Sequence, residues 1–188
     1  MISHLGPQNG VADGIALASK LKAEKKVTAV FNGDGGTSEG DFHEAVNVAA
    51  VWDLPVLFIV ENNGYGLSTP SSEQFRCESF ADNGIGYGMD AVSIDGNNIL
   101  EVYVTIHLLA ENIRKNPRPV LIESRTFRMR GHEEASGTKY VPKELMEEWA
   151  TKDPLETFER YLFQENVINE KFVSEARKQF KNEVEQAL

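Results

Sequence analysis

Apolar residues in this chain form short continuous runs that alternate with polar stretches. Residues 27–31 and 56–60 are such runs, and residues 91–94 and 120–124 are similar segments. Short runs of this kind predict strands that are apolar on both faces, as in parallel sheets covered on both sides.

Between these runs, apolar positions recur at the three- and four-residue spacing of helices. Val11, Ile15, Ala18 and Leu21 show this spacing first. Further helices are predicted at residues 73–85 and 99–115. A helix at residues 38–51 is expected to begin at a capping pair, Ser38 and Asp41, and to carry the apolar stripe Ala45, Val46, Ala49 and Ala50.

This alternation predicts an α/β fold, a doubly wound and mostly parallel sheet with helices on both faces. Residues 126–142 show no clear period and predict a long functional loop. Residues 145–150, 154–167 and 170–188 are helical in pattern and predict a C-terminal helical segment.

Composition narrows the class of partner. The 29 acidic and 19 basic residues give a formal net charge of -10, which argues against nucleic acid and anionic membrane as partners. The single cysteine, Cys77, cannot form an internal disulfide, and the run 56–60 is far too short to span a bilayer. We therefore expect a cytoplasmic protein with a small-molecule ligand.

The segment FNGDGGTSEGDFHEA, residues 31–45, places glycines and the carboxylate of Asp34 between a strand and a helix. Backbone amides and a helix N-terminus there can attract an anion, and glycines let a diphosphate approach the backbone. Taken alone, a glycine-rich turn after a strand is as often a purely structural turn that binds no ligand.

The second apolar strand ends in VENNGYG, residues 60–66, and 26 residues separate Gly35 from Asn62. One helical crossover fits that gap, so we expect both turns at the carboxyl edge of neighbouring parallel strands. Asp34, the Asn63 amide oxygen and a carbonyl near Tyr65 would then offer the hard oxygen ligands that Mg²⁺ prefers. An asparagine turn is the alternative interpretation of Asn62 or Asn63 alone.

The combination of GDG, 26 residues and NN resembles the thiamine-diphosphate motif. GDGGTSEGDFHEAVNVAA and LPVLFIVENNGYGLSTP are similar to the alpha subunit of the first component of 2-oxo acid dehydrogenase complexes, of the pyruvate, branched-chain and acetoin types. The resemblance extends from about Leu5 to the helices after Asp153. It implies a thiamine-diphosphate-binding fold, with Mg²⁺ held by Asp34, Asn63 and the Tyr65 carbonyl and the diphosphate contacted by the Gly35 and Gly36 amides.

Two more segments gain a role from this resemblance. The backbone from Ser3 to Leu5 matches a loop that contacts the aminopyrimidine, although Ser3 and His4 depart from the small and apolar residues common there. In MRGHEEASGTKY, residues 129–140, His132 matches the histidine that holds the cofactor and assists acyl transfer to lipoamide. Glu133 follows it, where the mammalian pyruvate enzyme has a regulatory phosphoserine, so that switch is not expected.

The function implied is thiamine-diphosphate-dependent oxidative decarboxylation of a 2-oxo acid. Residues 1–142 would form a cofactor-binding domain that is incomplete at its N-terminus, and residues 143–188 would be C-terminal helices of the same domain. The implied partners are a beta-type half, separate or fused, and a lipoyl acyltransferase, in an oligomer; the chain alone is expected to be inactive. Alternatives are a transketolase-like or non-oxidative enzyme, or a non-catalytic fragment that binds magnesium and diphosphate.

The other polar candidates are weaker. His132-Glu133-Glu134 lacks a second histidine at helical spacing, so zinc is not predicted. His43 has an open role, and His107 is expected to be a packing or boundary residue. A basic cluster at a strand exit could meet phosphate or a substrate carboxylate, or could simply be solvated; it comprises Arg125, Arg128 and Arg130.

Overall fold

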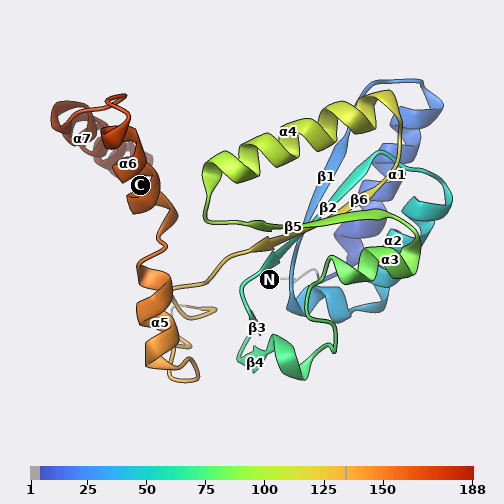
Figure 1. Ribbon diagram of the computed structural model, residues 1–188, viewed down its shortest axis with the longest axis horizontal. Coiled ribbons are helices and arrows are strands. Elements are labelled where there is room, and N and C mark those ends of the chain that lie inside the picture. Colours follow the sequence, from blue (N-terminus) through green and yellow to red (C-terminus); the bar gives the residue numbers. More distant parts are fainter. Residues whose placement is uncertain (1–4, 134) are drawn as a thin grey trace.

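A four-stranded parallel sheet forms the centre of the computed structural model, which describes residues 5–133 and 135–188. The strands are β1 (Thr28–Gly33), β2 (Val56–Asn62), β5 (Asp90–Asp95) and β6 (Val120–Arg125), in the spatial order β1-β2-β6-β5 (Figure 1). Every neighbouring pair in this sheet is parallel. The predicted α/β class is confirmed.

Helices cover both faces of the sheet and enclose two apolar cores. On one face, α1 (Pro7–Leu21), α2 (Gly40–Val51) and α3 (Asp82–Tyr87) meet a core that includes Phe58 and Val60; on the other, α4 (Ile99–Lys115) covers Leu57 and Ile59 (Figure 1). Consecutive residues of β2 thus enter opposite cores, as the alternation of side chains along a strand requires. This explains why residues 56–60 are apolar without interruption.

Helix α1 forms where predicted, but its apolar stripe does not face the core. Val11 and Ile15 are 63% and 54% exposed, whereas Ala12 and Ala16 are buried against the sheet. Small side chains let the helix lie close to the strands, and the larger apolar residues consequently point outward.

Two predicted helix boundaries were wrong. Helix α2 begins at Gly40 after Glu39, with no side-chain cap, because Ser38 belongs to a short 3-10 helix, η1 (Gly35–Ser38). The predicted helix at residues 73–85 is reduced to η2 (Ser71–Glu73) and α3. In the segment between η2 and α3, Phe80 is buried and Ser79 hydrogen-bonds Glu123. These interactions fix the segment in an irregular conformation and not in a helix.

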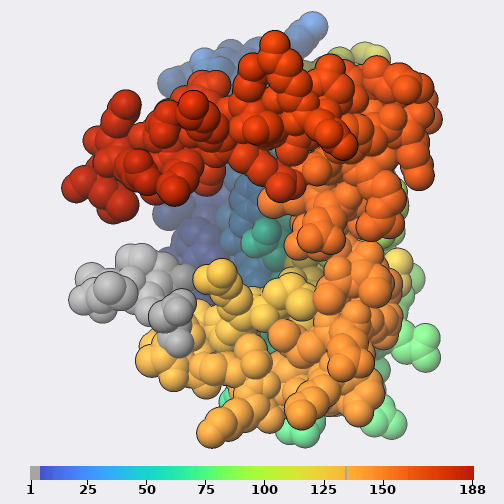
Figure 2. All heavy atoms as spheres, turned by 90° about the vertical axis from the view of Figure 1, so that its left-hand side faces the viewer, coloured from blue at the N-terminus to red at the C-terminus, as the bar shows by residue number. Residues whose placement is uncertain are grey.

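The predicted C-terminal helical segment is confirmed as α5 (Lys143–Ala150), α6 (Pro154–Gln164) and α7 (Glu170–Ala187). These helices stand beside the sheet and not on its faces, and in the side view α7 lies above the loop that follows β6 while α5 lies beside that loop (Figure 1 and Figure 2). Arg177 of α7 bonds Glu159 of α6 at 2.7 Å, and the ring of Trp149 stacks on Phe127. Among the described residues, no helix is long and apolar enough to cross a membrane.

Candidate cofactor and metal site

The two predicted turns lie against each other at the carboxyl edge of the sheet. Strands β1 and β2 are adjacent and parallel, and the residues after Gly33 and Asn62 leave the sheet at the same edge. Gly66 belongs to a small hairpin, β3 (Tyr65–Gly66) with β4 (Thr69–Pro70). A Cβ added to Gly35 would lie 2.9 Å from the Gly66 Cα, so the close contact between the two turns requires a glycine at position 35.

Asp34 is the buried carboxylate of this edge, with 1% of its surface exposed. The Ser71 hydroxyl donates to its Oδ2 at 2.6 Å, and the Thr37 hydroxyl donates to its backbone carbonyl at 2.7 Å. These bonds fix the carboxylate beside the second turn. Sequence reasoning missed Ser71, which no spacing or pattern distinguishes from the serine beside it.

The glycines after Asp34 present backbone amides. The first bonded amide of η1 is that of Thr37, which donates to the Asp34 carbonyl at 3.1 Å. The amides of Gly35 and Gly36 precede it, and the first amides of a helix have no partner inside that helix. They belong to the 3-10 turn η1, which precedes α2 as the glycine turn was expected to precede a helix.

Asn63 and Tyr65 form an asparagine turn in the second loop. The Asn63 Oδ1 accepts from the Tyr65 amide at 3.1 Å. Since an amide oxygen has two lone pairs, this bond leaves one free. The turn interpretation and the ligand interpretation of Asn63 are therefore compatible.

Glu123 of β6 holds the second turn through a hydrogen bond from Asn62. It is almost fully buried and accepts from Asn62 Nδ2 at 2.7 Å and from the Ser79 hydroxyl. Burial raises its pKa, but hydrogen bonds from Ser79, Asn62, Ser93 and the Phe80 amide outweigh burial and hold the pKa below its usual value. The ionised carboxylate thus orients Asn62. Sequence reasoning missed this residue, although a glutamate inside an apolar strand was a usable signal.

His132 lies in the loop at residues 126–142 and is exposed. Arg128 donates from Nη1 to the His132 Nδ1 at 3.0 Å and from Nη2 to the Leu67 carbonyl at 3.1 Å. An arginine can only donate, so Nδ1 accepts and the imidazole proton sits on Nε2. The Tyr140 ring also packs edge-on against Tyr65 at 5.6 Å. The loop is therefore attached to the β3–β4 hairpin at two points.

A cleft of about 300 Å³ opens beside these groups. Asn63, Tyr65 and Ser71 line it together with Arg125 and Trp149. Amide, hydroxyl and guanidinium groups in this cleft can bind an anionic ligand. Asn63 lines the cleft, whereas the buried Asp34 is joined to it only through its hydrogen bond from Ser71.

The remaining sequence candidates lie elsewhere. His43 hydrogen-bonds the Tyr87 hydroxyl and so joins α2 to α3. His107 is exposed and stacks on Tyr103 of the same helix, α4. Leu5 is exposed, and Ser3 lies outside the described residues. No cluster of His, Cys, Asp or Glu suited to a metal such as zinc occurs in the part of the chain that the structure describes.

Comparison with known proteins identifies the family. The family model for the dehydrogenase E1 component matches residues 2–188, and the chain belongs to this family. It is 40% identical over 179 residues to the alpha subunit of acetoin:2,6-dichlorophenolindophenol oxidoreductase of Bacillus subtilis, covering 95% of this chain and 53% of that protein.

Two further relatives are also named as alpha subunits. The 3-methyl-2-oxobutanoate dehydrogenase subunit alpha of Mycobacterium tuberculosis is 42% identical over 84% of this chain and 43% of its own length. The pyruvate dehydrogenase E1 component subunit alpha of Bacillus subtilis is 36% identical over 98% of this chain and 50% of its own length. The chain thus spans about half the length of these relatives. The resemblance drawn from the sequence is confirmed.

Proposed function

We propose that this chain is the magnesium- and diphosphate-binding part of a 2-oxo acid dehydrogenase first component. The observation that carries the proposal is the contact between the Asp34–Gly36 and Asn63–Gly66 turns at the carboxyl edge of adjacent parallel strands. Ligands of open α/β sheets bind at this edge.

The groups present fit Mg²⁺ and a diphosphate. The Asp34 carboxylate, the free lone pair of the Asn63 amide oxygen and the Tyr65 carbonyl are hard oxygen donors. Magnesium would complete its octahedral shell with phosphate oxygens and water. The Gly35 and Gly36 amides would donate to the diphosphate, and the Ser3–Leu5 backbone would contact the aminopyrimidine.

When bound, thiamine diphosphate would supply the carbanion chemistry that releases carbon dioxide from a 2-oxo acid. This chain would hold and orient the cofactor: Asn62, fixed by Glu123, positions the turn that carries Asn63. His132 carries its proton on Nε2, where it can donate to a phosphate oxygen or transfer a proton during acyl transfer to lipoamide. Arg128 positions that imidazole.

The partners follow from the family. The relatives are named alpha subunits. We infer a beta-type half, separate or fused, and a lipoyl acyltransferase that receives the acyl group, in a cytoplasmic oligomer. Because the chain covers about half of its relatives, complete catalytic machinery is not expected from it alone.

The test is reconstitution of the chain with its beta-type half. Carbon dioxide release and lipoamide acylation are measured with pyruvate and with 3-methyl-2-oxobutanoate, with and without thiamine diphosphate and Mg²⁺. Turnover should require both halves and both cofactors. Turnover by this chain alone, or none by the reconstituted pair with any 2-oxo acid, would contradict the proposal. Calorimetry adds a control, since a non-catalytic fragment should bind inorganic diphosphate as tightly as the thiamine form.

A further inference from the structure

The side chain of Gln74 lies against both turns of the candidate cofactor site. A Cβ added to Gly66 would lie 2.7 Å from Gln74 Oε1 and 2.8 Å from its Nε2, so the carboxamide occupies the space that a side chain at position 66 would need. A Cβ added to Gly35 would lie 3.6 Å from the same Oε1. The proposed function has so far given Gln74 no role.

The backbone before Gln74 is fixed to the same two turns. In η2, the Ser71 backbone amide donates to the Gly64 carbonyl at 2.8 Å, and the Ser71 hydroxyl donates to Asp34 Oδ2 at 2.6 Å. The Gln74 backbone amide in turn donates to the Ser71 carbonyl at 2.9 Å. Because these bonds fix the chain at position 74, the side chain reaches the two turns from one defined place.

A single hydrogen bond sets the orientation of the carboxamide. Gln74 Nε2 donates to the Thr69 carbonyl at 3.0 Å. Since a carbonyl oxygen can only accept, the nitrogen faces Thr69 and Oε1 remains beside Gly35. Within residues 5–133 and 135–188, the carboxamide makes no other hydrogen bond. It therefore contacts the two turns by packing, and it places an uncharged oxygen next to the glycine turn.

The absence of charge on this group matters because of its position. The Gly35 and Gly36 amides would donate to the diphosphate, and the formal net charge of -10 already opposes an anionic ligand. A glutamate has the length of a glutamine and could occupy the same space, but it would bring a negative charge beside these amides, where like charges repel. Size and neutrality are thus separate requirements at position 74, and glutamine meets both.

We propose that Gln74 is a positioning residue of the cofactor site. Its carboxamide sets the spacing between the Asp34–Gly36 turn and the Asn63–Gly66 turn, and it keeps negative charge away from the Gly35 amide. This inference rests on the proposed function, because the spacing and the charge matter only if a diphosphate binds at this edge of the sheet.

The test measures thiamine-diphosphate affinity by calorimetry in the reconstituted enzyme with Mg²⁺. Gln74→Ala, which removes the spacer, should weaken binding at least tenfold. Gln74→Glu keeps the length but adds a charge, so it should weaken binding more than Gln74→Ala does. Gln74→Met keeps the length without a charge and should stay closest to the wild type. Gln179→Glu is the matched control, because it makes the same change of charge at an exposed position of α7, and it should bind like the wild type.

The order of the variants separates positioning from simple packing. A residue that only packs would make Gln74→Ala the weakest binder, since truncation removes the most contacts. That order, or wild-type affinity in all three Gln74 variants, would overturn the inference and leave the proposed function in place. If the wild-type enzyme did not bind the cofactor, the proposed function would fail and the inference with it. Melting temperatures without cofactor verify that each variant retains its fold.

Discussion

Some residues at the carboxyl edge of the sheet could be predicted from the sequence, and others could not. Asp34 and Asn63 were predictable because each follows an apolar strand and one crossover separates them. The contact of Ser71 with Asp34 was not, since it joins residues 37 positions apart, and the local contact of Arg128 with His132 was not, since it depends on the irregular conformation of their loop. The side-by-side position of Asp34 and Asn63 could be predicted from spacing, whereas the contact of Ser71 with Asp34 could not.

His132 provides a test at this scale. In the reconstituted enzyme, His132→Ala should lower lipoamide-dependent turnover by about 10²–10⁴-fold, the usual contribution of a general acid or base. Its exposed position gives it little packing to lose, so the melting temperature should hardly change. His107→Ala is the matched control, because His107 is also exposed. Wild-type acyl transfer with a large fall in melting temperature would make His132 a structural residue.

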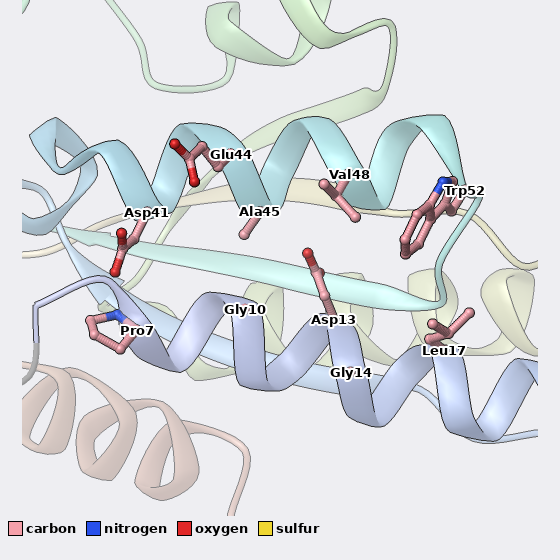
Figure 3. Close-up of a pocket in the computed structure, with 10 residues that line it drawn as sticks. All are labelled: Pro7, Gly10, Asp13, Gly14, Leu17, Asp41, Glu44, Ala45, Val48 and Trp52. Carbon is pink, nitrogen blue, oxygen red and sulfur yellow. The ribbon is translucent and has the colours of Figure 1, made fainter.

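Asp13 provides a second test, through pH. Burial raises its pKa from 3.8 to about 7. The folded chain therefore holds this proton after the unfolded chain has released it, and stability falls as pH rises from about 4 to about 7. Asp41 and Glu44 are the titratable groups that line the groove between α1 and α2 together with Asp13 (Figure 3).

Asp13→Ala should consequently stabilise the isolated chain at pH 8. At about 1.4 kcal/mol for each pKa unit, the gain is on the order of a few kcal/mol, and it should nearly vanish at pH 4. Urea unfolding at the two pH values measures the difference. An equal gain at both would show that the Asp13 carboxyl group does not cause the pH dependence.

At the scale of elements, the predicted strands and most helices were found, with α4 at the predicted residues 99–115. The failures have physical causes. Burial of Phe80 and the Ser79–Glu123 bond replaced a predicted helix with an irregular segment. In α1, the apolar spacing predicted a helix correctly but not the face that is buried, because Ala12 and Ala16 fit closer to the sheet than Val11 or Ile15.

The contact between the two turns can be tested at this scale. Gly35→Ala should separate the turns, since the new Cβ would lie 2.9 Å from the Gly66 Cα. We expect at least a tenfold loss of thiamine-diphosphate affinity in the reconstituted enzyme. Gly36→Ala is the matched control, because a Cβ there meets nothing within 4 Å, and it should cost less. Equal affinities for Gly35→Ala and wild type would mean that the turns need not touch.

At the scale of the whole molecule, local patterns predicted the class of fold but not its arrangement. The insertion of β6 between β2 and β5 depends on pairing across distant parts of the sequence. The helical periodicity of residues in α5 to α7 predicted these helices but did not indicate that they lie beside the sheet. The family model matches residues 2–188 and so spans the sheet and these helices, while the division at residue 142 stays a prediction.

Magnesium-dependent binding of thiamine diphosphate tests the central claim most directly. Calorimetry on the reconstituted enzyme compares wild type with Asp34→Ala, with and without Mg²⁺, and uses Glu175→Ala, an exposed carboxylate of α7, as the control. Wild type and Glu175→Ala should bind the cofactor much more tightly with Mg²⁺. Asp34→Ala should lose that dependence while its melting temperature in the absence of cofactor stays close to that of the wild type. Unchanged magnesium dependence in Asp34→Ala would contradict the assignment of this edge as the metal and diphosphate site.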